Sequence, residues 1–221
     1  MSIYPVLAAL LDYPQQALLD ALDEIDAALV AHPDAARELA PLVGELRGRS
    51  LIESQEEYVA TFDRNPRHSL HLFEHVHGES RDRGQAMVDL LAEYRRFGLE
   101  ISTNELPDYV PLFLEVLGLI DADDASALLG EAVHVLAAIG KHLLDSGSAY
   151  ASIFTVLCEM SVVAPEPLTV APVRDMDEAL EVFGVGEDGV EPLIMRSEVQ
   201  PVHFHPRAER LNATARAKEM Q

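Results

Sequence analysis

Histidines and glutamates alternate with apolar residues between positions 68 and 79 of the chain. Within this segment, His71-Leu-Phe-Glu-His75 matches the H-x-x-E-H pattern of inverted zinc peptidases, in which two histidines bind Zn²⁺ and the glutamate acts as a base. A catalytic zinc needs a third protein ligand, and the many acids downstream single out none. A zinc-dependent hydrolase is therefore one interpretation. The residues concerned are His68, His71, Glu74, His75, His77 and Glu79.

The same segment has two interpretations that involve no catalysis. In the first, the apolar residues Leu70, Leu72, Phe73 and Val76 pack inward, while the histidines and acids cap helix ends or face solvent. In the second, the polar cluster borders a surface that recognises a protein partner. The spacing of the residues leaves all three interpretations open.

The elements that would position this cluster are predicted to be helices. Apolar residues recur at spacings of three and four over residues 15–32, which is typical of an amphipathic helix. Ser50-Leu-Ile-Glu53 has the pattern of a capping box and predicts the start of a helix. The buried face of this helix is expected to consist of Leu51, Ile52, Tyr58, Val59 and Phe62. No period-two pattern of strands is present. Further helices are expected over residues 34–46, with a kink or restart at Pro41, and over residues 81–97, 107–119, 122–144 and 148–163.

The composition supports an all-α fold. Hydrophobic residues make up 48% of the chain, but aromatic residues only 6%, so the core must consist mainly of Leu, Ala and Val, which favours helices over sheets. We expect a single bundle-like helical domain over residues 1–165. Six of the 13 prolines fall in the last 58 residues. Residues 166–221 are therefore predicted to form a proline-rich, loosely ordered C-terminal tail with one short helix over residues 175–183.

The charge of the chain restricts its partners. The formal net charge is -22, from 38 acidic and 16 basic residues. Such a surface repels phosphate backbones and anionic lipid headgroups, and it attracts basic peptides. We therefore expect no nucleic-acid partner, although acidity also serves solubility alone.

The chain has no features that call for export or for an oxidising compartment. Its single cysteine, Cys158, cannot form an internal disulfide. No Lys or Arg precedes Arg37, so the positive region of a secretory signal is missing. The apolar stretches 109–120 and 150–163 are shorter than the roughly 20 residues of a membrane span. We expect a cytoplasmic protein without direct membrane insertion.

Two segments carry a resemblance to a known family. Tyr58-x-x-x-Phe62-Asp63, followed by residues 70–87 (LHLFEHVHGESRDRGQAM), resembles the signature block of the NarJ-type nitrate reductase chaperones. The segment from Glu105 to Glu115 is similar to the second block of the same family. The likeness covers residues 1–165, and it places the H-x-x-E-H match inside a chaperone block.

The resemblance implies a helical fold of the TorD-like chaperone type, without catalysis and without a cofactor of its own. It implies a protein that binds the immature catalytic (alpha) subunit of respiratory nitrate reductase through that subunit's N-terminal segment. The chaperone would hold the subunit for insertion of the molybdenum cofactor and would be absent from the mature enzyme. Residues 105–109 resemble the acidic, proline-containing hinge that the broader family places between helices. Tyr109 stands where TorD-type relatives commonly carry a histidine, so the nucleotide-binding role suggested for that hinge in relatives is not carried over.

The residues suggest where such a client peptide would bind. No Lys or Arg occurs between Arg96 and Lys141, while this stretch holds eight acids and an apolar helix face. An apolar groove with an acidic margin suits an amphipathic helix that bears Lys or Arg, although a core helix with a solvated acidic face has the same pattern. We expect the groove to be lined or supported by Tyr58, Phe62, Leu72, Phe73, Leu112 and Phe113, with Glu79, Asp82, Glu105 and Asp108 on its margin.

Overall fold

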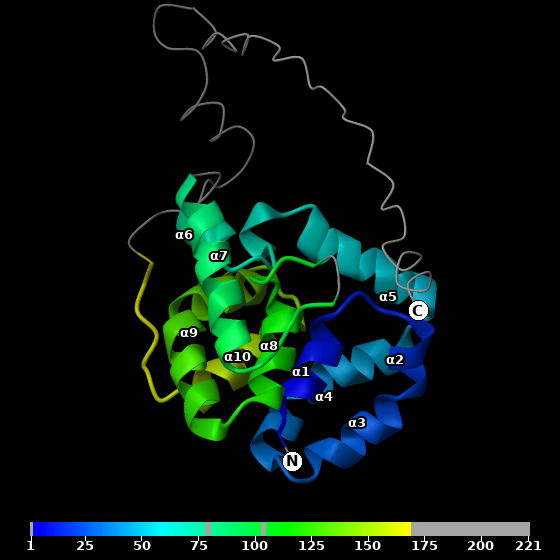
Figure 1. Cartoon of the computed structure of the whole chain (residues 1–221). Coiled ribbons are helices and arrows are strands. Elements are labelled where there is room, and N and C mark those ends of the chain that lie inside the picture. The colour runs from blue at the N-terminus through cyan, green and yellow to red at the C-terminus, as the bar shows by residue number, and fades with distance from the viewer. Residues whose placement is uncertain (1, 78–80, 103–104, 169–221) are drawn as a thin grey trace, which may run out of the picture. The chain divides into compact units, whose positions relative to one another are not determined.

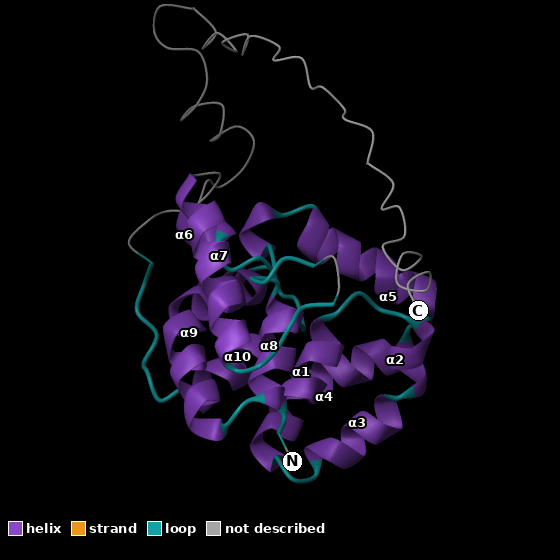
Figure 2. Cartoon of the chain, viewed as in Figure 1, coloured by secondary structure: helices purple, strands orange, loops and turns teal. Residues whose placement is uncertain are grey.

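The computed structural model describes residues 2–77, 81–102 and 105–168, and these residues form helices and loops without any strand (Figures 1 and 2). The all-α prediction is therefore confirmed. The first half comprises α1 (Tyr4–Leu11), α2 (Gln16–Asp20), α3 (Leu22–Leu29), α4 (Pro33–Gly48), α5 (Leu51–Tyr58) and the π-helical turn η1 (Val59–Asp63). The second half comprises the 3₁₀ turn η2 (Pro66–His68), α6 (Glu74–His77), α7 (Arg81–Arg96), α8 (Val110–Leu119), α9 (Ala122–Asp145) and α10 (Ala151–Met160).

The core forms where α1 packs against α8 and α9 packs against α10, with α4 crossing α10 (Figure 1). Leu7, Leu114, Leu129 and Ile139 are fully buried there. The contact between α9 and α10 is close, because a Cβ atom built on Gly140 would lie 2.6 Å from Cβ of Phe154. A small residue on α9 therefore lets the two helices meet.

The N-terminal half confirms the predicted capping box. The Ser50 hydroxyl accepts a hydrogen bond from the Glu53 amide at 3.3 Å, and the Glu53 carboxylate accepts one from the Ser50 amide at 2.8 Å. The helix predicted over residues 15–32 is divided at Ala21 into α2, which buries no residue, and α3, which buries three. Helix α4 continues through Pro41 without a restart; this proline is exposed.

The helix predicted from Pro107 begins three residues later, at Val110. Tyr109 is its N-cap residue, and Pro111 occupies the first turn. The Pro107 carbonyl instead accepts a hydrogen bond from the buried Tyr94 hydroxyl at 2.8 Å, which attaches α7 to the loop before α8. Residues 105–109 are thus held as a loop that carries polar groups into the domain.

Beyond α10, the chain returns along α9. The Glu166 amide donates a hydrogen bond to Nδ1 of His134 at 2.9 Å, and the Val163 side chain covers Gly130. The boundary at residues 165/166 stays a prediction, and the short helix predicted over residues 175–183 lies outside the described residues. Within the described part, α9 is the one helix long and apolar enough to cross a membrane, and half of its apolar window is buried among other helices, as in a core helix.

Candidate functional site

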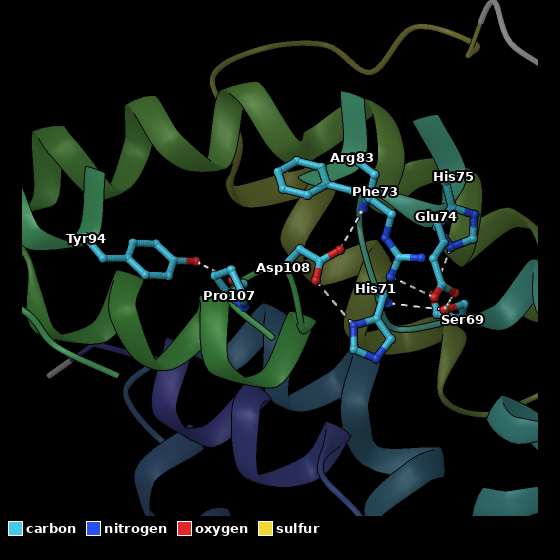
Figure 3. A network of polar contacts seen from close by, with 9 residues as sticks. All are labelled: Ser69, His71, Phe73, Glu74, His75, Arg83, Tyr94, Pro107 and Asp108. Carbon is cyan, nitrogen blue, oxygen red and sulfur yellow. Dashed lines mark hydrogen bonds and ion pairs between the residues drawn. The ribbon is translucent and has the colours of Figure 1, made fainter. Parts of the chain in front are cut away.

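The two segments that carry the family resemblance meet through their backbones. His71 and Tyr109 form an isolated antiparallel bridge. The Leu72 amide donates to the Asp108 carbonyl at 3.0 Å, and the Val110 amide donates to the Leu70 carbonyl at 2.8 Å. Segments nearly 40 residues apart in the sequence thus form one unit, in which the Asp108 side chain points toward His71 and Phe73 (Figure 3).

Asp108 is the centre of this unit and is fully buried. Its Oδ2 atom accepts a hydrogen bond from the Phe73 amide at 3.1 Å, and its Oδ1 atom lies 3.3 Å from Nδ1 of His71 (Figure 3). A buried carboxylate is tolerated only when such donors replace water. The hydrogen bond to Asp108 raises the pKa of His71 above its ordinary value. Asp108 therefore holds the start of the signature segment in place.

A second polar cluster continues along the same segment. The Glu74 carboxylate accepts a hydrogen bond from the Ser69 hydroxyl and pairs with Arg83 of α7 at 3.0 Å. Nε2 of His75 donates to the Ser69 carbonyl at 2.8 Å, and burial lowers the pKa of His75. These contacts join the turn at residue 69 to α6 and α7 (Figure 3).

His68 makes a separate set of contacts, between two turns of the backbone. Its Nδ1 atom donates to the Thr61 carbonyl at 2.8 Å, so its Nε2 atom is free to accept from the Asn65 amide group at 3.3 Å. The ring is buried and both of its nitrogens are engaged. This histidine ties the π-helical turn η1 to the turn η2.

The described residues do not arrange the H-x-x-E-H segment as a zinc site. The rings of His71 and His75 are hydrogen-bonded to Asp108 and to the Ser69 carbonyl, and Glu74 is paired with Arg83. Only the second half of the pattern is helical, because α6 begins at Glu74. Within the described ranges, no three His, Cys, Asp or Glu side chains are placed to hold a metal ion.

Tyrosines connect this unit to α1 and α5. The Tyr58 hydroxyl donates to the Leu11 carbonyl at 3.2 Å and lies 3.2 Å from the Tyr109 hydroxyl, which in turn lies 3.3 Å from a carboxylate oxygen of Asp12. The Tyr58 ring also packs edge-on against Tyr13, with the ring centres 5.5 Å apart. Burial raises the pKa of Tyr109 to about 12, so these hydroxyls stay protonated at neutral pH.

The structure divides the ten predicted groove residues by exposure. Tyr58, Phe62, Leu72 and Phe113 are buried, so they support a surface. Asp108 is buried rather than on a margin, because the Phe73 amide and the His71 ring replace its hydration. The remaining described members are exposed Glu105 and half-buried Phe73 and Leu112. Glu79 and the side chain of Asp82 lie outside the described residues.

Sequence reasoning missed two residues of this region, Asp12 and Tyr13. Asp12 accepts hydrogen bonds from the Tyr13 amide at 2.8 Å and from the Tyr109 hydroxyl. Tyr13 is exposed and packs on the signature residue Tyr58. Neither belongs to a motif, and no periodic pattern marks them, so only the contacts could reveal them.

The raised pKa of His71 predicts a pH dependence of stability. Since the folded state binds this proton more tightly than the unfolded state, His71 contributes stability that is full below about pH 6.5 and is lost as the pH rises through the folded pKa. We therefore expect His71→Asn to reduce the free energy of urea unfolding more at about pH 6 than at about pH 8.5.

His142 is the matched control for this measurement. Burial lowers its pKa, so its contribution has the opposite sign and is present at high pH. His142→Asn should therefore cost relatively more at the alkaline end. An effect of His71→Asn that is the same at every pH would contradict the assigned role of Asp108.

Comparison with known proteins identifies the family of this chain. The profile of the family described as nitrate reductase delta subunit matches residues 12–156. The nitrate reductase molybdenum cofactor assembly chaperone NarJ of Escherichia coli (strain K12) is 39% identical over 178 residues, which cover 79% of this chain and 75% of that protein.

Two further relatives are probable nitrate reductase molybdenum cofactor assembly chaperones. The probable chaperone NarW of Escherichia coli (strain K12) is 40% identical over 161 residues, covering 73% of this chain and 68% of the relative. The probable NarJ of Bacillus subtilis (strain 168) is 29% identical over 102 residues, covering 46% and 55%. The chain therefore belongs to the nitrate reductase delta subunit family, as an assembly chaperone of the NarJ type rather than an enzyme.

Proposed function

We propose that this chaperone binds the immature catalytic (alpha) subunit of respiratory nitrate reductase in the cytoplasm, through the subunit's N-terminal segment. It holds the subunit open for insertion of the molybdenum cofactor and then leaves. The observation that carries the proposal is the identity of 39–40% to NarJ and NarW over most of the chain. The net charge of -22 suits a client segment that carries Lys or Arg, because an acidic surface attracts basic peptides.

The eight described groove residues keep a role in this proposal. The buried members and the Asp108 network form a rigid support, while Glu105, Phe73 and Leu112 provide its accessible part. A rigid support lowers the entropy cost of binding a segment that orders only on contact. The described residues give the zinc hydrolase alternative no support, because His71, Glu74 and His75 are engaged by Asp108, Arg83 and the Ser69 carbonyl.

Calorimetric titration of a synthetic peptide with the N-terminal sequence of the catalytic subunit tests the proposal. We expect saturable one-to-one binding, and no binding of a scrambled peptide with the same composition. In pull-down experiments, the chaperone should retain catalytic subunit from cells that cannot make the cofactor and should retain little of the mature reductase. Lack of peptide binding together with equal capture of both forms would disprove it.

A further inference from the structure

Residues 12–17 run from the end of α1 into α2 and lie beside α5 (Figure 1). Within this segment, every residue of which the structure describes, Pro14 alone is buried. The segment lies between Leu11, which is fully buried, and Leu18, which packs half-buried against the core. We call residues 12–17 the strap. Because the strap buries so little apolar surface, we expect it to open locally at a much lower free energy than the whole domain unfolds.

The strap is held by hydrogen bonds at groups that water can reach. Gln55 of α5 donates to the Pro14 carbonyl at 2.9 Å, and the Tyr109 hydroxyl donates to the Asp12 carboxylate at 3.3 Å. Asp12 is exposed, and Gln55 and Tyr109 are half-buried. When the strap lifts, water replaces the lost partners, so these bonds contribute only a small net free energy to the closed state.

The strap lies against a cluster of buried aromatic rings. The Tyr13 ring, which is 42% exposed, packs edge-on against Tyr58, with the ring centres 5.5 Å apart. The Tyr58 ring packs on Phe62 at 4.7 Å, and Tyr150 at the start of α10 lies 6.0 Å and 5.0 Å from these two rings. All three inner rings are buried. Tyr58 and Phe62 carry the family likeness, so signature residues lie beneath a segment that is only weakly attached.

We propose that the strap is an autoinhibitory contact, which the client's N-terminal segment displaces. With the strap lifted, an apolar side chain of the client takes the place of the Tyr13 ring on Tyr58, and the freed Asp12 carboxylate is available to a Lys or Arg. Since only the open fraction of the chain binds, the closed strap lowers the apparent affinity by that fraction. The inference rests on the proposed function and adds that Tyr58, a support in the closed chain, becomes a contact residue in the open one.

The sign of the effect of Tyr13→Ala on client binding tests the proposal. Removing this ring uncovers Tyr58 and destabilises the closed strap, so the N-terminal client peptide should bind the full chain at least about threefold more tightly in a calorimetric titration. Gln55→Ala, which removes the hydrogen bond to the Pro14 carbonyl, should act in the same direction. Leu119→Ala truncates an exposed apolar side chain on α8 and should bind within about twofold of the wild type.

Amide hydrogen exchange followed by NMR tests the opening itself. The Leu18 amide donates to the Gln15 carbonyl of the strap at 3.0 Å, so lifting the strap breaks this hydrogen bond. In the free wild-type chain, the Leu18 amide should exchange at least about a hundredfold faster than that of Ile139, which is fully buried in α9. Tyr13→Ala should speed the exchange of Leu18 by about the factor by which it tightens binding. Saturating client peptide should speed it further, because the bound chain holds the strap open.

The outcomes separate the strap from the client assignment. If the wild type binds the peptide but Tyr13→Ala binds equally well or more weakly, the strap does not compete with the client, while the client assignment stands. Greater protection of the Leu18 amide in the complex would likewise overturn the strap, because binding would then close this segment. Absence of peptide binding to the wild type would overturn both proposals. Circular dichroism of each variant confirms that its helices are retained.

Discussion

Replacing Asp108 with alanine is expected to lower the free energy of unfolding by about 3 kcal/mol. The variant removes the carboxylate that accepts from the Phe73 amide and the His71 ring, at a site where this carboxylate is fully buried. Loss of a hydrogen bond at a buried site costs about 1–3 kcal/mol, and the half-buried His71 ring recovers part of this from water. Urea unfolding followed by circular dichroism measures the loss.

Two comparisons make this result specific. Asp108→Asn keeps one oxygen for the Phe73 amide, so about half of the loss should remain. Glu105→Gln, three residues earlier and exposed, should change stability by less than about 0.5 kcal/mol. A wild-type-like Asp108→Ala variant would show that the bridge between residues 71 and 109 does not depend on this carboxylate.

Gly140→Ala is expected to destabilise the protein by about 2 kcal/mol, although alanine is the better helix former. The added methyl group would lie 2.6 Å from Cβ of Phe154, next to the backbone of α10. No rotation of a side chain can move a Cβ atom away, so α9 and α10 must separate. Thermal and urea unfolding of the variant should both show the loss.

Gly44→Ala in α4 is the control for Gly140→Ala. Nothing lies within 4 Å of a Cβ atom built at Gly44, so only the helix preference remains. This substitution should stabilise the protein by up to about 1 kcal/mol. If both alanine variants were stabilised, the close contact between α9 and α10 would not limit the packing of the core.

Most of the helices could be predicted because their signals are local. Apolar spacing and a capping box act between residues three or four positions apart, and these signals found α5, α7 and α9 closely. Helix α1 gave no such signal. It buries Leu7, Ala8, Leu10 and Leu11 on a short segment, so it lacks the contrast between an apolar and a polar face.

The candidate site was only partly predictable for a different reason. The signature residues could be found as a string, but the string does not tell which members are buried. Phe62 is buried as predicted, but Ile52, which was predicted on the same buried face, is 67% exposed. Phe113 is a core residue, and Asp108 is turned inward to meet two donors from a segment nearly 40 positions away. Tyr13 entered the site only through its contact with Tyr58.

The segment of histidines and glutamates between positions 68 and 79 shows most clearly which properties follow from the sequence and which from the tertiary structure. By itself, the sequence determined the helical class, the acidic character and the family resemblance, because these depend on composition, on short-range spacing and on a contiguous string of residues. Only the tertiary structure decided what each histidine does. His71 contacts Asp108, His75 contacts the Ser69 carbonyl and His68 contacts the Thr61 carbonyl, and each partner is chosen by how distant or folded-back segments pack. Burial and long-range pairing are properties of the whole fold, so a local pattern that suits zinc became a set of structural hydrogen bonds.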